Sequence, residues 1–347
     1  MFGAGEVIDE AIVILDKVPR CKEHEGREDM SYLVTGGTGF IGSCIVRDLV
    51  REGEHVVVYD LHPDRSFLQR FMSEDEIESM VTIVRGDVTD PPHLFRTILE
   101  NKVEKIIHTA SLLSPESNSN PYLAVEVNCQ GTICVFEAAR TLGLKKVVYA
   151  SSNACFGPAE KYPQEYIPND APHYPQNMYG ATKAFNEAVA AYYFSHYGVD
   201  ITGIRYLDVY GVGARRGLFA TILQELITKP ALGKPARISH GDAFVGWSYV
   251  DDPARATVMA SKVLKTKTRS YSVMGDVRSV REAADYVRKI LPDADITVLP
   301  GAFTVYPVRF DTRLIEEEIG YRPEWSMERG IKEAINLTRK EHGLPPI

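Results

Sequence analysis

The chain has 347 residues, 44% of them hydrophobic and 25% charged, and its formal net charge is -8. This balance argues against a disordered or membrane-embedded chain, and the scattered lysines and arginines leave no basic patch for nucleic acid or anionic lipid. Because the length exceeds the usual size of one core, we expect one large domain or two fused domains.

The first 29 residues stand apart from the rest of the chain. Their apolar side chains fall on one face of a predicted helix, at Ile8, Ala11, Ile12 and Leu15, and a charged linker follows over residues 20–29. Acidic residues interrupt the apolar stretch and no basic leader precedes it, so it is not a secretory signal. We predict that residues 1–29 are an appended arm that covers a surface patch or a neighbouring subunit.

Short apolar strands alternate with helices from Met30 onward. The predicted strands span residues 32–34, 55–59, 81–84, 105–108, 146–150 and 201–206, and the predicted helices span 41–51, 122–142 and 179–196. Continuously apolar strands separated by helices indicate a parallel sheet covered on both faces, with ligands at the carboxyl ends of its strands. The predicted fold class is therefore α/β, a doubly wound parallel sheet of Rossmann type.

The last third of the chain has a different pattern. From about Gly211 it carries shorter helices, proline and glycine breaks, and a final amphipathic helix over residues 327–339. We assign residues 30–210, with a return segment near 243–262, to the Rossmann domain. Residues 211–347 are predicted to form mainly a smaller, C-terminal substrate-binding region.

A glycine-rich turn joins the first predicted strand to the first predicted helix. Gly36 permits a tight turn, Gly39 removes a side chain where a pyrophosphate approaches, and Gly42 lets the helix pack closely on the strand. The N-terminus of the helix then faces the phosphate charge. The motif alone is weak, but its position between a strand and a helix predicts a dinucleotide cradle and makes residues 30–210 the NAD-binding domain.

Two acidic residues follow the next strands. Asp60 ends the second strand, where a carboxylate accepts hydrogen bonds from an adenosine ribose and repels a 2'-phosphate. This favours NAD over NADP, although Arg65 lies nearby. Asp87, after the third strand, is placed to meet the adenine amino group.

A tyrosine and a lysine mark the chemical end of the predicted site. Tyr179 and Lys183 are four residues apart on a predicted helix, so their side chains lie side by side. A lysine ammonium and an oxidised nicotinamide both favour the phenolate, which makes Tyr179 a workable general base. Ser152, after the strand at 146–150, is placed to hold the same substrate oxygen. With 18 tyrosines, about one such spacing arises by chance, so the pair gains its meaning from the motifs before it.

Taken together, these motifs resemble the extended short-chain dehydrogenase/reductases, the NAD-dependent epimerase/dehydratase superfamily, over residues 30–340. The matching elements are residues 35–42, 60, 86–89, 108–111, 128–132, 151–157, 179–183, 205–211 and 249–252.

The resemblance implies a role for each matching position. Ser152, Tyr179 and Lys183 would be catalytic, and Asn128 would serve the fold around the site. The expected cofactor contacts are Gly36, Gly39, Phe40, Ile41, Gly42, Asp60, Asp87, Val88, Ala110, Tyr179, Lys183 and Tyr206. The expected substrate contacts are Ser111, Ser152, Asn153 and Asp208.

Departures from the family pattern narrow the chemistry. Dehydratases and decarboxylases of the superfamily carry a glutamate two residues after the catalytic hydroxyl, where this chain has Ala154, so elimination lacks its acid/base group. Nucleotide-sugar members show asparagine at Asp208 and arginine at Val245, and losing both weakens diphosphate binding unless Arg215, Arg216 or Arg309 compensates. The segment 244–249 suggests a more apolar pocket, unless its aromatic side chains belong to the core.

The leading hypothesis is an NAD-dependent oxidoreductase that interconverts a small or moderately apolar secondary alcohol and a ketone. A sugar or nucleotide-sugar epimerase, which uses the same three residues but retains its cofactor, is the alternative. A dinucleotide-sensing protein without turnover is the third hypothesis, and the intact Ser152, Tyr179 and Lys183 set argues against it.

Partners and location follow from simpler features. Five cysteines without a Cys-x-x-Cys pair indicate reduced thiols of a cytoplasmic protein, and no apolar run reaches membrane-spanning length. His108 and His173 lack ligands at metal spacing, so we expect no metal. The resemblance implies a homodimer through the helices at 122–142 and 179–196, with a small molecule as substrate.

Overall fold

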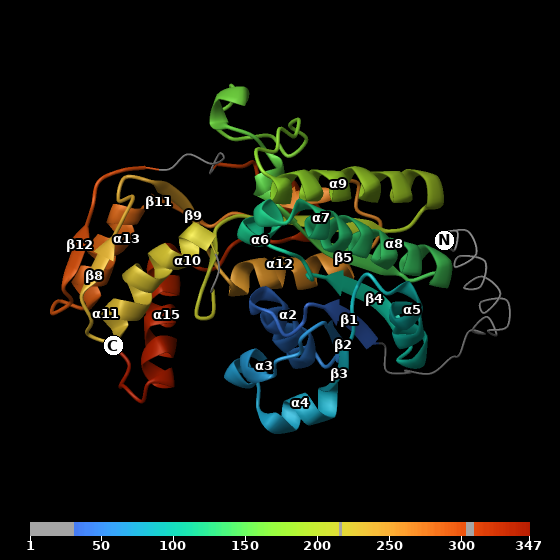
Figure 1. The fold of residues 1–347 in the computed structure, drawn as a ribbon, viewed down its shortest axis with the longest axis horizontal. Helices are drawn as coiled ribbons and strands as arrows, with labels where there is room; N and C mark the ends of the chain where they lie inside the picture. Colours follow the sequence, from blue (N-terminus) through green and yellow to red (C-terminus); the bar gives the residue numbers. More distant parts are fainter. Residues whose placement is uncertain (1–30, 215–216, 303–308) are drawn as a thin grey trace.

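A seven-stranded parallel sheet organises the computed structural model, which describes residues 31–214, 217–302 and 309–347. The predicted arm at 1–29 lies outside the described residues. The strand order is β10-β6-β5-β4-β1-β2-β3, of which Figure 1 labels the part β5-β4-β1-β2-β3. In chain order these strands are β1 (Ser31–Thr35), β2 (His55–Asp60), β3 (Val81–Arg85), β4 (Val103–His108), β5 (Lys146–Ser152), β6 (Ile201–Tyr206) and β10 (Ser270–Ser272). The predicted doubly wound α/β fold is confirmed.

Helices cover both faces of this sheet. Successive side chains of a strand point to opposite faces, so Leu33 and Val34 of β1 enter different apolar clusters. One face packs on α2 (Phe40–Arg51) and α12 (Asp251–Lys262), which also touch each other. The other face is covered by α5 (Pro91–Glu100), α8 (Gly131–Leu142) and α9 (Met178–Tyr197). None of the helices in the described part of the chain is long and apolar enough to span a membrane.

The remaining helices complete the connections. The helix predicted at 122–142 is three consecutive pieces, α7 (Pro121–Ala124), a π-helical η1 (Val125–Gln130) and α8. Shorter helices are α3 (Ser66–Phe71), α4 (Glu74–Met80), α6 (Ser114–Ser119), η2 (Asn153–Cys155) and η3 (Ala159–Lys161).

The C-terminal part of the chain forms a smaller region at one end of the sheet (Figure 1). It holds a three-stranded sheet, β11 (Asp276–Ser279), β9 (Phe244–Tyr249) and β7 (Val209–Tyr210), and a pair of strands, β12 (Ile296–Val298) and β8 (Ala236–Ile238). Its helices are α10 (Gly217–Leu223), η4 (Gln224–Thr228), α11 (Lys229–Ala231), α13 (Val280–Ile290), α14 (Arg313–Ile319) and α15 (Met327–Glu341). β10 leaves this part of the chain to join the large sheet, and the division into two domains stays a prediction.

Candidate active site

The predicted dinucleotide cradle is the turn between β1 and α2. Gly36 adopts a left-handed φ of +68°, and a Cβ there would lie 2.9 Å from the backbone nitrogen of Ala110. A Cβ on Gly42 would lie 2.1 Å from the carbonyl oxygen of Gly36, which no real side chain tolerates. Gly39 is the N-cap of α2 without a side-chain cap, so the first-turn N–H groups retain their capacity to bind an anion. These residues therefore fit a dinucleotide phosphate.

Asp60 lies at the end of β2 and touches the same turn. Its Oδ2 accepts hydrogen bonds from the backbone nitrogen of Thr38 at 3.2 Å and from the Thr38 hydroxyl at 2.7 Å. After β3, the Asp87 carboxylate accepts from the backbone and the hydroxyl of Thr89 at 2.9 and 2.8 Å. Both carboxylates are thus held in place at the strand ends, where the sequence predicts cofactor contacts.

The other predicted cofactor residues lie along the same edge. Phe40 and Ile41 open α2 and are partly buried against the core, and Val88 is buried. Ala110 follows β4 and donates its N–H to the Thr35 hydroxyl at 3.3 Å. Tyr206 ends β6, and its hydroxyl pairs with the Thr257 hydroxyl at 2.7 Å.

Ser152, Tyr179 and Lys183 meet where β5 ends against α9. Ser152 is the last residue of β5; its hydroxyl accepts from the backbone N–H of Ala154 at 3.1 Å and lies close enough to the Tyr179 phenol to lower its pKa. The Lys183 Nζ donates to the carbonyl oxygen of Ala150 at 2.8 Å and lies 5.4 Å from the centre of the Tyr179 ring. The structure therefore brings the three predicted catalytic side chains together.

Burial shifts the titration of both basic candidates. It raises the pKa of Tyr179 to about 12, and the neighbouring Ser152 hydroxyl acts in the opposite direction. Burial also lowers the pKa of Lys183 to about 8, although Cys129 and Glu187 raise it. An ammonium at the Lys183 Nζ, 5.4 Å from the centre of the Tyr179 ring, would also favour the phenolate, and this role of Lys183 stays a prediction.

Asn128 ties the loop after β4 to α9. Its Oδ1 accepts from the backbone N–H of Leu112 at 2.7 Å and from the Ser111 hydroxyl at 3.1 Å. Its Nδ2 donates to the Leu112 carbonyl at 3.0 Å and to Thr182 at 3.2 Å. This fully used, buried amide matches the fold-supporting role implied for Asn128, and it places Ser111 near the α9 residues.

The two other predicted substrate residues point into different surroundings. Asn153 is fully buried; its Oδ1 accepts from the Ser272 hydroxyl at 3.1 Å, and its Nδ2 has no hydrogen-bond partner among the described residues. Asp208 has a positive φ of 41°, and its carboxylate accepts from the backbone N–H of Gly246 at 3.1 Å. A buried amide nitrogen without a partner is a group that a ligand oxygen can satisfy.

The aromatic segment 244–249 belongs mainly to the core. Trp247 is fully buried, and its Nε1 donates to the Arg278 carbonyl at 3.0 Å. Tyr249 and Val245 are buried as well, while Phe244 is exposed. The buried aromatic side chains of the segment therefore serve the core, where Trp247 packs on Tyr210 and Phe219, and Tyr249 packs on Trp325.

Of the three arginines expected to compensate at Val245, only Arg309 lies within the described residues, and Arg215 and Arg216 lie outside them. Arg309 is exposed and approaches Glu165 at 3.9 Å, at the distance limit of an ion pair.

Both histidines considered as ligands have other partners. His108 is buried between the hydroxyls of Thr35, at 2.7 Å, and Thr132, at 3.1 Å, and burial lowers its pKa to about 3. His173 lies with Cys155 and Glu187 in a cluster whose ligand atoms are within 4.8 Å of one another. The Glu187 carboxylate, however, is already bound by a guanidinium.

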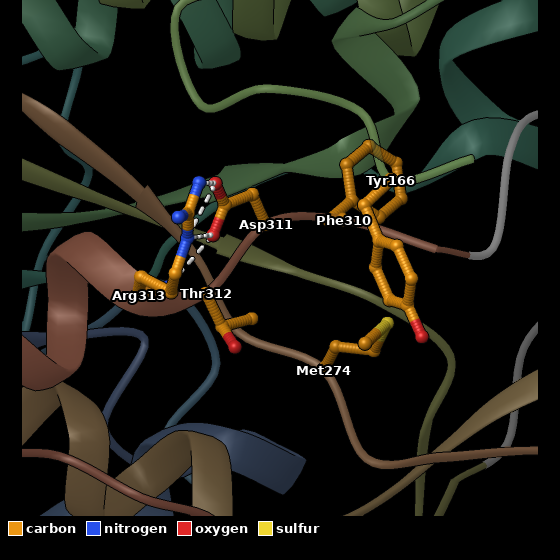
Figure 2. A pocket seen from close by; sticks show the side chains of 6 residues that line it. All are labelled: Tyr166, Met274, Phe310, Asp311, Thr312 and Arg313. Atoms are coloured by element: carbon orange, nitrogen blue, oxygen red, sulfur yellow. Dashed lines mark hydrogen bonds and ion pairs between the residues drawn. The ribbon is translucent and has the colours of Figure 1, made fainter. Parts of the chain in front are cut away.

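A proline-rich loop, residues 162–177, precedes α9. A cavity of about 330 Å³ lies between this loop and the segment that leads into α14 (Figure 2). Tyr166, Met274 and Phe310 face it, and the Asp311–Arg313 ion pair lies at its side. A parallel bridge between Ile167 and Phe310 joins the two segments. None of Ser152, Tyr179 and Lys183 lines this cavity, so we do not place the chemistry there.

Sequence reasoning missed a buried ion pair under the site, formed by Arg205 of β6 and Glu187 of α9. Two signals pointed to it. Arg205 is a charge inside an otherwise apolar strand, and Glu187 lies four residues after Lys183 on the same helix face. Charges at such positions are almost never buried unless they are paired.

A phosphate cradle at one point of the sheet edge and a tyrosine–lysine pair at another define a dinucleotide-dependent oxidoreductase of the Rossmann type. Residues 32–273 match the NAD dependent epimerase/dehydratase family, and the chain belongs to this family. It is accordingly an NAD-dependent enzyme of the extended short-chain dehydrogenase/reductase type.

Relatives in this family include both epimerases and dehydrogenases. The UDP-glucuronate 4-epimerase of Thermodesulfobacterium geofontis is 26% identical, over 89% of this chain and 96% of its own. The UDP-glucose 4-epimerase of Thermus thermophilus, solved in complex with NAD, is 26% identical with a TM-score of 0.74, covering 89% of this chain and 99% of its own. The L-threonine dehydrogenase of Phytophthora infestans is 25% identical with a TM-score of 0.76, covering 88% and 98%.

Proposed function

We propose that this enzyme oxidises a small secondary alcohol to a ketone, or catalyses the reverse reduction, with NAD as a released cosubstrate. The observation that carries the proposal is the meeting of Ser152, Tyr179 and Lys183 at the end of β5, at the same carboxyl edge of the sheet as the glycine turn after β1, with Ala154 where an elimination enzyme needs a carboxylate. The similarity to a threonine dehydrogenase supports this direction.

The proposed oxidation gives each of these residues a role. NAD, when bound, supplies the hydride acceptor. Tyr179 takes the hydroxyl proton of the substrate, and Ser152 donates a hydrogen bond that holds the substrate oxygen. Lys183 keeps an ammonium near the phenol and would bind the nicotinamide ribose. Gly36, Gly39, Gly42 and Asp60 would hold the other half of the dinucleotide.

The experiment is a comparison of the two hydride fates. The protein is incubated with NAD and, separately, L-threonine, 2-butanol, 3-hydroxybutyrate or UDP-glucose, while absorbance at 340 nm is followed. We expect NADH to accumulate with an alcohol or hydroxy acid. Isomerised UDP-glucose without free NADH would instead establish the epimerase, which the epimerase relatives favour. If the protein binds NAD but turns over none of the four probes, neither alcohol oxidation nor epimerisation holds for these substrates.

We further propose a homodimer that packs through α7 and α9. Tyr122 on α7 is 81% exposed, and Phe185 and Tyr192 on α9 are 41% and 49% exposed, so these two contacting helices present three aromatic side chains to solvent. Sedimentation should give a dimer for the native protein and a monomer for Phe185→Glu. We place the enzyme in the cytoplasm, a proposal supported by the free thiols of Cys44, Cys129, Cys134 and Cys155.

A further inference from the structure

Glu187 is a buried carboxylate on α9, two turns after Tyr179 and one turn after Lys183. Its Oε1 accepts from the Ser151 hydroxyl at 2.5 Å and from the Arg205 Nε at 2.8 Å, and its Oε2 accepts from the Arg205 Nη2 at 2.6 Å. One side chain thus contacts β5 directly before Ser152 and β6 directly before Tyr206.

Arg205 carries the connection further, to the proline-rich loop. Its Nη1 donates to the Asn169 carbonyl at 2.7 Å, and the Asn169 Nδ2 donates to the Ser270 carbonyl at 2.7 Å. Helix α9, strands β5, β6 and β10, and the loop are therefore joined by one network centred on the Glu187 carboxylate.

The buried Glu187–Arg205 network is not explained by its contribution to folding stability. Burying two charges costs several kcal/mol per ion, and apolar residues of the same volume often do as well or better. A metal site does not explain it either. Both oxygens of the Glu187 carboxylate already accept hydrogen bonds, from the Ser151 hydroxyl and from the positively charged Arg205 guanidinium. The cluster of Glu187 with Cys155 and His173 therefore offers a cation no open anionic ligand.

We infer that Glu187 is a positioning residue, which sets the Ser152 hydroxyl against the Tyr179 phenol by holding the end of β5 to α9 through Ser151. Residues spaced by four on a helix lie near one face, so Tyr179, Lys183 and Glu187 are presented on the same side of α9. The carboxylate of Glu187 also raises the pKa of Lys183 against the effect of burial. The inference rests on the proposed function, because it assigns the alignment of the proposed catalytic hydroxyl.

The test is a matched pair of substitutions at Ser151. Ser151→Thr keeps the hydroxyl that Glu187 accepts, and Ser151→Val has the same shape without it. Both are measured with whichever of the four probes the native enzyme turns over. We expect the threonine variant to keep a kcat near the native value and the valine variant to lose roughly 10- to 100-fold, because small misplacements at a reacting centre have effects of this size. Binding of NADH, followed by fluorescence, should be unchanged in both.

Equal kcat values in the two variants, or a loss in Ser151→Val matched by an equal loss of NADH affinity or of folded protein, overturn the inference. Glu187→Gln, which keeps the side-chain shape, should also lower kcat while NADH binding persists. Should that variant not fold, the Ser151 pair still decides. Ser152→Ala separates the two proposals. If it retains native turnover, the catalytic role of Ser152 and the alignment assigned to Glu187 both fail, while the alcohol oxidation itself stands. If Ser152→Ala is inactive and the two Ser151 variants are equally active, only the positioning role fails.

Discussion

The turn after β1 and the region after β5 lie at the same carboxyl edge of the sheet, but the first is made of backbone and the second of buried side chains. At the turn, the glycines matter because atoms are missing: a Cβ at Gly42 would overlap a carbonyl oxygen. Behind Ser152, a guanidinium, a carboxylate and a lysine are withdrawn from water. We therefore expect phosphate binding at the turn and proton transfer at Tyr179 to respond to different substitutions, because they depend on different kinds of contact.

Tyr179→Phe should have the largest effect on turnover, because it alters the proton-transferring side chain and leaves the glycine turn unchanged. Tyr179→Phe removes only the hydroxyl that exchanges a proton with substrate, so kcat should fall about 10³-fold, within the usual range for a general acid or base. The NAD dissociation constant should change less than about threefold, because the glycine cradle is untouched. Steady-state rates and equilibrium titration measure the two quantities. Native turnover in this variant would remove Tyr179 from the mechanism.

The converse change breaks the cradle. Gly42→Ala should weaken NAD binding at least about tenfold and lower the free energy of unfolding by roughly 1–3 kcal/mol, because the added carbon forces the backbone of Gly36 to shift. Gly53→Ala is the control: it has open space but a φ of +84°, so it should cost stability alone. Calorimetry gives both values, and equal NAD affinities in the two variants would contradict this account of the cradle.

His108 predicts an acid-dependent loss of stability. Burial lowers its pKa from 6.5 to about 3, so below pH 6.5 the unfolded chain binds a proton that the folded protein does not. The free energy of unfolding should therefore fall as the pH falls from 6.5 towards 3, by up to about 1.4 kcal/mol per pH unit from this group. His108→Gln, which can still pair with both threonines, should remove that slope in urea unfolding at pH 7.5, 6 and 5. An identical slope in both proteins assigns the effect elsewhere.

A substitution at Asp60 should have the smallest effect, a change in the preference for NAD over NADP. Asp60→Asn keeps the size of the side chain but removes its charge, so NAD affinity should fall about tenfold while the penalty against NADP shrinks, as a charge-assisted hydrogen bond is lost. Asp64→Asn, at an exposed position in the following loop, should alter neither affinity. Parallel titrations with NAD and NADP compare the two. An unchanged NAD to NADP ratio in Asp60→Asn would show that another group reads the ribose.

The same contrast explains what could be predicted from sequence. The strands, the glycine turn and the Tyr179 helix were predictable, because apolar runs, glycines and a four-residue spacing are local signals. Strand β10 has three residues and gives no such signal. Trp247 was ambiguous because an aromatic residue in an apolar run fits a pocket and a core equally well. The partners of Glu187 come from distant segments, at Ser151 and Arg205, so their meeting follows only from the strand order.

The proposed mechanism requires the Tyr179 hydroxyl to lie beside the reactive carbon of a bound nicotinamide. A crystal structure of the protein with NAD measures the distance between the Tyr179 hydroxyl oxygen and the C4 atom of that ring. We predict about 5 Å or less, so that one substrate carbinol can reach both groups at once. A separation beyond about 8 Å, with the cradle occupied by the pyrophosphate, would contradict the account.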